Sequence, residues 1–302
     1  MLIVRNIRIT RILKNTWQVD IIMLITCSLV YFFHNEFVKY HIEIPAIVPT
    51  VMGTAIAFFI GFNNNQAYDR WWEARKIWGA IVNDSRSWAR SVMSYVQQGN
   101  DGAAIAPVQQ RLVYRHLAFL YALKAALRGA DTNGYTRYLT DDEAEHIRSY
   151  TNTHNILLQW QSRDLKMLLA NNSIDGFRFI QMDSLLTKFS DEMGMSERIK
   201  KTVFPTTYSY LTKVFIWIFV VAIAFVTSQT MGPWSIFISW LLSFIFVSTQ
   251  INGMSLVDPF ENNVAGIPLN QITRNIEIDL LQMLGEEDIP APITPVNGEY
   301  VL

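Results

Sequence analysis

The sequence predicts an all-α membrane protein with four hydrophobic transmembrane helices, and three observations support this fold class. Half of the 302 residues are hydrophobic and only 17% are charged, which is less than in a typical soluble domain. Three long segments, 21–35, 44–68 and 214–257, contain no Asp, Glu, Lys or Arg. The polar remainder shows helical periodicity and no strand pattern. A bilayer span needs about 20 apolar residues, so the last segment holds two spans. Buried helices of a soluble protein could explain the first segment but not the last.

The N-terminal segment, residues 1–16, sets the expected orientation. It carries Arg5, Arg8, Arg11 and Lys14, whereas the loop after the first hydrophobic segment has only Lys39. The positive-inside rule therefore places the N-terminus in the cytoplasm, and four spans return the C-terminus to the same side. A secretory signal is the competing interpretation, but no small-residue cleavage site follows the apolar run.

Residues 17–68 are expected to form the first two spans. Aromatic residues flank the first span, at Trp17 and at 31–33, as is common at membrane interfaces. In the second span, Thr54, Phe58 and Phe62 follow one another at one-turn spacing and so share a face. That face either packs against another helix of the same subunit or, in an assembly, lines a pore that rings of phenylalanine gate by excluding water.

Residues 69–207 form a polar, helix-rich region that this topology places in the cytoplasm. Apolar side chains recur at helical spacing from Trp71 to Tyr95, which predicts an amphipathic helix that continues the second span. A second helix is expected over 112–127, ending near Gly129. Thr140 begins a third with a capping pattern. A break at 171–172 precedes a helix from about Ile174 to Glu192.

Residues 208–257 supply the third and fourth spans, and Gly232-Pro233 is the expected turn between them. Residues 258–302 form a C-terminal tail in the cytoplasm. Its end, 289–302, is rich in proline and is expected to lack regular structure.

Motifs for catalysis or metal binding are not evident in the sequence. Glu143 and His146 have the spacing of carboxylate-bridged metal sites, and His154 lies two turns further on. Such sites need a second copy of the Glu-His pair, which the sequence lacks. A solvated helix face is therefore the favoured interpretation. Phosphate loops, nucleophile elbows and zinc motifs do not appear. The chain has a single cysteine, Cys27, and a net charge of −1. We therefore expect neither an enzyme, a cofactor, a bound metal nor a nucleic-acid partner.

Three segments resemble the bestrophin family of ion channels. The run from Gly61 to Arg75, followed by Trp78-Gly79, is similar to the signature of prokaryotic homologues. Glu197-Arg198-Ile199, with Pro205 and Tyr208, resembles the segment before their third span, and the stretch 255–260 resembles the one after their fourth. The matches occur in the family's order along the chain.

This resemblance implies a homo-pentamer in the cell membrane, in contact with the lipid bilayer, with one pore on the fivefold axis for permeant monovalent ions. The family's hydrophobic neck falls on Thr54, Phe58 and Phe62. Its second constriction, a single apolar side chain near a helix start, is matched by Ile174.

The sequence also departs from the family pattern. Thr54 is smaller than the usual aliphatic residue, and Asn63 stands where a basic residue is common. Animal members bind calcium through acidic residues after the Pro-Phe pair. Here Pro259-Phe260 is followed by Glu261 and two asparagines, too few carboxylates for calcium, which takes 6–8 oxygen ligands.

Selectivity depends on two opposing features. Phenyl rings that present their positive edges to a narrow axis favour anions, which points to Phe58 and Phe62. Asp69 and Glu73 could place negative charge in the cytoplasmic vestibule and attract cations, but vestibule charge is screened within about 8 Å. The sequence therefore predicts a channel for monovalent anions such as chloride, with a cation channel of the same fold as the alternative. A transporter or scaffold without a continuous pore is less favoured, because a transporter built from repeats should show a broken helix in each half.

Overall fold

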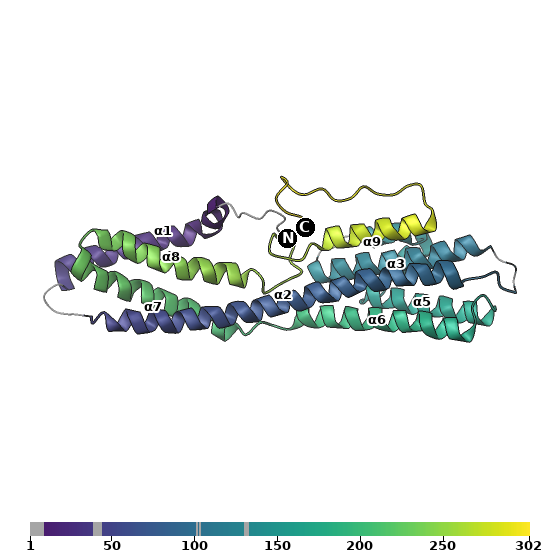
Figure 1. Ribbon diagram of the computed structural model, residues 1–302, viewed down its shortest axis with the longest axis horizontal. Coiled ribbons are helices and arrows are strands. Elements are labelled where there is room, and N and C mark those ends of the chain that lie inside the picture. Colours follow the sequence, from purple (N-terminus) through teal and green to yellow (C-terminus); the bar gives the residue numbers. More distant parts are fainter. Residues whose placement is uncertain (1–8, 39–43, 101, 103, 130–132) are drawn as a thin grey trace. The chain divides into compact units, whose positions relative to one another are not determined.

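The computed structural model describes all residues except 1–8, 39–43, 101, 103 and 130–132 (Figure 1). The described secondary structure is helical, apart from one isolated bridge between Val296 and Tyr300. The helices are α1 (Ile9–Phe33), the π-helical η1 (His34–Val38), α2 (Ile47–Tyr95), α3 (Ile105–Arg128), the 3-10 helix η2 (Asn133–Tyr138), α4 (Asp141–Ile147), α5 (Thr153–Ala170), α6 (Gly176–Lys201), α7 (Thr206–Met231), α8 (Trp234–Met254) and α9 (Leu269–Leu284).

The chain divides into two compact units. The first, here named the hydrophobic unit, contains α1, the first half of α2, α7 and α8. The second, the polar unit, contains the rest of α2 from Trp72, α3 to α6, and the C-terminal segment from Asp258.

The hydrophobic unit contains the helices that can cross a membrane. In the part of the chain that the structure describes, four helical stretches are long and apolar enough for this, and they fall in α1, α2, α7 and α8. Within this unit α1 packs against α7 and α8, and α7 packs against α8. Their shared core includes Met23, Ile56, Phe219 and Val247. This arrangement confirms the predicted all-α protein with four long hydrophobic helices.

The turn between α7 and α8 is the predicted one. Gly232 has a φ of 55°, a conformation that costs glycine little, and Pro233 follows it as the N-cap of α8. The two most hydrophobic helices of the chain therefore form a tight antiparallel hairpin.

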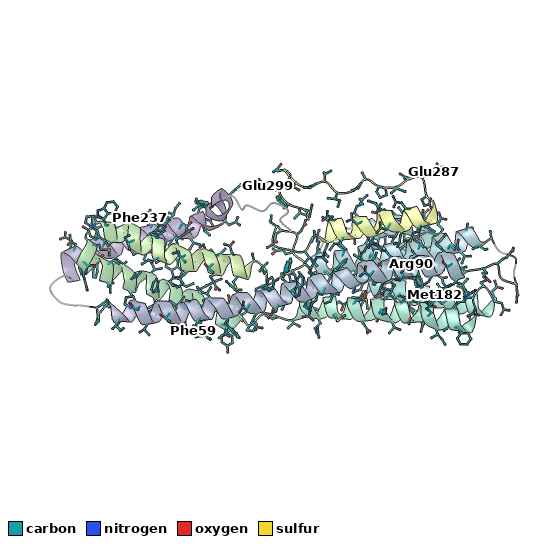
Figure 2. All side chains as sticks on the ribbon, viewed as in Figure 1. Phe59, Arg90, Met182, Phe237, Glu287 and Glu299 are labelled. Carbon is teal, nitrogen blue, oxygen red and sulfur yellow. The ribbon has the colours of Figure 1, made fainter. Side chains whose placement is uncertain are left out.

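The polar unit is built around α3, which contacts α5, α6 and α9. Its core is aromatic where α3 meets α2 and α6: the rings of Trp88, Phe119 and Phe189 lie within one cluster. Met182 of α6 is fully buried in the same unit (Figure 2). The buried Glu277 carboxylate accepts hydrogen bonds from Tyr121, at 2.6 Å, and from Tyr138, which ties α9 to α3 and η2.

Helix ends in the polar unit follow local sequence signals. Gly129, at a φ of 61°, caps α3, and Thr140 and Glu143 form the predicted capping box of α4. The helix expected over 174–192 instead begins at Gly176 and runs to Lys201. Asp175 determines this start, since its carboxylate accepts a hydrogen bond from the Arg178 amide at 2.8 Å.

Candidate pore-lining site

One face of α2 in the hydrophobic unit carries apolar side chains that the described helices of the same chain leave uncovered. Val51 is 60% exposed, Phe58 73% and Phe62 49%, and Phe59 beside them is also exposed (Figure 2). Ile56 and Ile60 point the other way and are buried in the core of the unit. Contiguous exposed apolar surface of this kind marks a site of interaction with lipid or protein. The three residues expected at the neck thus lie on the open face of α2.

Thr54 lies on the same face as the phenylalanines, but its hydroxyl group is hydrogen-bonded within its own helix. Its hydroxyl donates a hydrogen bond to the Thr50 carbonyl at 3.0 Å, within the helix. The hydroxyl proton of Thr54 is therefore already donated to a backbone carbonyl of α2. The face that Thr54, Phe58 and Phe62 form is mainly one of phenyl rings and methyl groups.

Asn63 and Asn64, just after the residues expected at the neck, point toward the other helices of the hydrophobic unit. Asn63 is 3% exposed, and its amide donates to the Thr212 hydroxyl of α7 at 3.1 Å. The Asn64 amide donates to the Thr249 carbonyl of α8 at 3.3 Å. Asn63 is therefore a helix-packing residue in this structure, not a group at the open face below the neck.

Asp69 and Glu73 follow on the next turns of α2. Asp69 is exposed. Glu73 is partly exposed and accepts a hydrogen bond from Arg198 of α6 at 2.6 Å. An exposed ion pair of this kind adds little stability, but it does offset the charge of Glu73. The acidic character expected at this level therefore rests mainly on Asp69.

Ile174 is buried within the single chain, at 3% exposed, which counts against a role as a pore constriction. It precedes the N-cap of α6, and its amide lies 3.4 Å from the Leu168 carbonyl of α5. Phe177, on the first turn of α6, is 88% exposed, more than any other large hydrophobic residue described. Phe177 follows the Asp175 N-cap by two positions, a local sequence signal for an apolar side chain at a helix start.

The polar groups weighed as metal ligands have other partners. Glu143 accepts hydrogen bonds from Arg115, and His154 lies 2.6 Å from Glu197. Asp258 pairs with Lys200 at 2.5 Å, so its charge is already compensated beside the Pro-Phe pair. Among the described residues there is no group of three or more His, Cys, Asp or Glu side chains arranged to hold a metal ion.

The chain matches a family model over nearly its whole length. Residues 2–282 fit the model described as bacterial and fungal bestrophin protein. The chain belongs to the bacterial and fungal bestrophin family. The resemblance seen in the sequence signature is thereby confirmed.

Curated relatives of this bestrophin are 27% to 30% identical to it over the aligned residues. The voltage-dependent anion channel-forming protein YneE of Escherichia coli is 30% identical over 247 residues, which cover 82% of this chain and 79% of the relative. The voltage-dependent anion channel-forming protein mll4386 of Mesorhizobium japonicum is 27% identical, over 83% of this chain and 78% of the relative. These names describe channel-forming proteins and not enzymes, as expected for this chain.

A solved bacterial bestrophin homologue from Klebsiella pneumoniae has the same fold. It superposes with a TM-score of 0.81 at 24% identity, covering 89% of this chain and 98% of that one. The four apolar helices and the polar helical region of this bestrophin therefore form the family's architecture.

Proposed function

We propose that this bestrophin is a homo-pentameric channel that passes monovalent anions such as chloride along an axis lined by α2. The observation that carries the proposal is the exposed face of α2, where Phe58 and Phe62 are uncovered in the single chain. Assembly around an axis would turn this face toward a common pore. The relatives' names, which describe anion channel-forming proteins, support the same function.

The neck of the proposed pore consists of rings from Thr54, Phe58 and Phe62. Phenylalanine rings at a narrow axis exclude water and gate by dewetting. Their positive edges interact favourably with an anion at the point where it has lost most of its hydration. Because the Thr54 hydroxyl is bonded to its own helix, the phenyl rings dominate the electrostatics of the neck.

The second constriction of the proposed pore is better assigned to Phe177 than to Ile174. Phe177 is exposed at a helix start, which allows five copies to converge, whereas Ile174 would have to leave the core of the polar unit. Because the α6 N-cap is formed by the Asp175 carboxylate, the position of the first turn is well defined.

A monovalent cation channel is the second candidate, and the exposed Asp69 favours it. Two observations weaken this alternative. Glu73 is paired with Arg198, and any charge in a wide vestibule acts through water and is screened within about 8 Å. The neutral Asn63, turned toward α7, favours neither ion.

The proposed location is the cell membrane, with both termini in the cytoplasm. The argument rests on the basic N-terminal segment, of which Arg5 and Arg8 lie outside the described residues, as does Lys39 of the following loop. Labelling of single cysteines introduced at either end, in intact cells and in inverted vesicles, tests this topology.

The reversal potential under a potassium chloride gradient tests the selectivity. Purified protein in planar bilayers should give a value close to the chloride equilibrium potential. A value near the potassium equilibrium potential would overturn the anion assignment. Phe58→Ile removes one ring per subunit at similar volume, and a shift of its reversal potential toward potassium would attribute the preference to the phenyl edges.

A further inference from the structure

A layer of buried polar side chains crosses the hydrophobic unit near the end where α1 begins and α8 ends. Its members are Thr16 and Asp20 of α1, Asn63 and Asn64 of α2, Thr212 of α7 and Gln250 of α8. Asp20 is 8% exposed and Gln250 2%. An ionisable group buried among transmembrane helices is costly, and such groups usually mark a functional site.

Contacts between the helices place these residues near the same end of the unit. Asn63 reaches Thr212 of α7, and Asn64 reaches the carbonyl of Thr249, the residue before Gln250. Figure 1 shows α1 and α8 running in opposite directions within this unit. Further along the pair, the Cys27 side chain lies beside the Ser239 side chain. Equal steps from this contact along both helices bring Thr16 opposite Gln250, with Asp20 one turn away.

The layer has an excess of oxygen atoms without partners. Asp20 Oδ2 accepts a hydrogen bond from the Thr16 hydroxyl at 2.6 Å. Asp20 Oδ1, Asn64 Oδ1 and Gln250 Oε1 are buried and have no hydrogen-bond partner, against one unpartnered donor, Gln250 Nε2. No described basic side chain forms an ion pair with Asp20. A buried carboxylate without a counter-charge is strongly unfavourable, so the layer is incomplete as it stands.

Gly253 helps to create this arrangement. It lies one turn beyond Gln250 on α8, where the Asn64 carboxamide occupies the space that a Cβ atom would need. The close approach lets the α2 amide reach α8 and leaves its Oδ1 buried. The sequence of α8 thus makes room for the polar Asn64 side chain of α2 instead of an apolar contact.

We propose that each subunit binds one small monovalent cation, of the size of sodium, in this layer, with oxygen ligands from Asp20 of α1 and Gln250 of α8, two helices that pack together. Carboxylate and amide oxygens are the ligands that hard cations prefer. One carboxylate supplies one negative charge, which a monovalent ion neutralises, whereas a divalent ion would leave an excess positive charge in an apolar environment. The site lies inside one subunit, away from the exposed face of α2, and is independent of the proposed permeation path.

Equilibrium sodium binding to the full-length protein in detergent tests the proposal directly. Protein dialysed into N-methylglucamine chloride is titrated with sodium chloride at constant chloride, and both bound ²²Na⁺ and the melting temperature are measured. We expect saturable binding of one sodium per subunit and a matching rise in melting temperature, since a ligand that binds only the folded state stabilises it. Absence of bound sodium, or equal melting temperatures in the two salts, would overturn the proposal.

Variants assign the binding to the layer. Asp20→Asn keeps the shape and removes the charge, and should abolish sodium binding and the sodium-dependent shift in melting temperature. Glu36→Gln removes the same charge from an exposed position in η1 and should leave both unchanged. If Asp20→Asn does not yield folded protein, Gln250→Met removes one ligand at similar size and should weaken sodium affinity by about tenfold or more. Unchanged affinity in the layer variants would place the ion elsewhere and overturn the proposal.

Discussion

Phe58 and Phe62 are the residues on which the proposed gate depends, because their rings are exposed in the single chain. Replacing either with alanine removes a ring of apolar volume from the axis and should let water enter the neck. We therefore expect Phe58→Ala and Phe62→Ala to raise single-channel conductance or open probability, measured in planar bilayers, without loss of folded protein.

Phe219 provides the matched control for these two changes. It is 4% exposed and packs against Phe246 in the core of the hydrophobic unit. Phe219→Ala should lower stability by about 3–5 kcal/mol and leave the conductance of any folded channel unaltered. If the neck variants behave like Phe219→Ala, with poor yield and no gain in current, the neck residues are ordinary packing residues.

Glu192 of the polar unit should make stability depend on pH. It is 4% exposed, and burial, together with the nearby Asp84 carboxylate, raises its pKa to about 8. Between the ordinary pKa of 4.5 and about 8, the folded state holds a proton that the unfolded state has released. Stability therefore falls as the pH rises through this window, by at most about 5 kcal/mol.

Melting temperatures at pH 5 and pH 9 measure this effect. Glu192→Gln cannot ionise and should flatten the pH dependence, with its largest gain over the native chain at the higher pH. Asp183→Asn, an exposed change on the same helix, should keep the native profile. An identical profile in Glu192→Gln would mean that another group causes the pH dependence.

Single residues were predictable from the sequence only where spacing determines direction. The shared exposed face of Thr54, Phe58 and Phe62 follows from helical periodicity. The burial of Ile174 was not predictable, because its direction depends on the point where α6 begins, which the Asp175 cap shifts by two positions relative to the expected start. The inward direction of Asn63 depends on Thr212, far along the chain, which no local pattern reveals.

Among the helices, the packing of α2 on α8 depends on Gly253, where the Asn64 amide fills the space next to the backbone. Gly253→Ala should push α2 and α8 apart and lower stability by about 1–3 kcal/mol. Gly194→Ala in α6, where an added methyl meets no atom, should be neutral or stabilising by about 0.5–1 kcal/mol. Thermal unfolding of the two variants compares them, and equal effects would argue against a close approach at Gly253.

The helices themselves were largely predictable where strong local signals exist. The continuation of the second span into an amphipathic helix appears as the unbroken α2, and the caps at Gly129 and Thr140 lie where the sequence indicates. The expected elements lacked α9, although its amphipathic face packs on α3. A helix in a tail becomes apparent only once its partner surface is known, because tertiary packing supplies most of its stability.

For the whole molecule, the exposed α2 face predicts the assembly. In a lone subunit lipid would cover that apolar face, but it would also meet Thr54 and the exposed Asn65 and Gln66 at the end of the face, which is unfavourable for polar groups. Light scattering of the protein in mild detergent, with the detergent contribution subtracted, should give the mass of five chains. A mass of one or two chains would contradict the pentamer.

The polar layer between α1 and α8 also has a consequence for how the chain is made. Asp20 enters the membrane with the first helix, but Gln250 is synthesised near the end of the chain. At about 5–20 residues per second, ten seconds or more pass before α8 can cover the carboxylate. During that time α1 carries an uncovered carboxylate near its end, at a cost below the roughly 2.5–3.5 kcal/mol of a charge at the bilayer centre. Newly inserted chains should therefore depend on the insertion machinery to hold α1 until the last helix arrives.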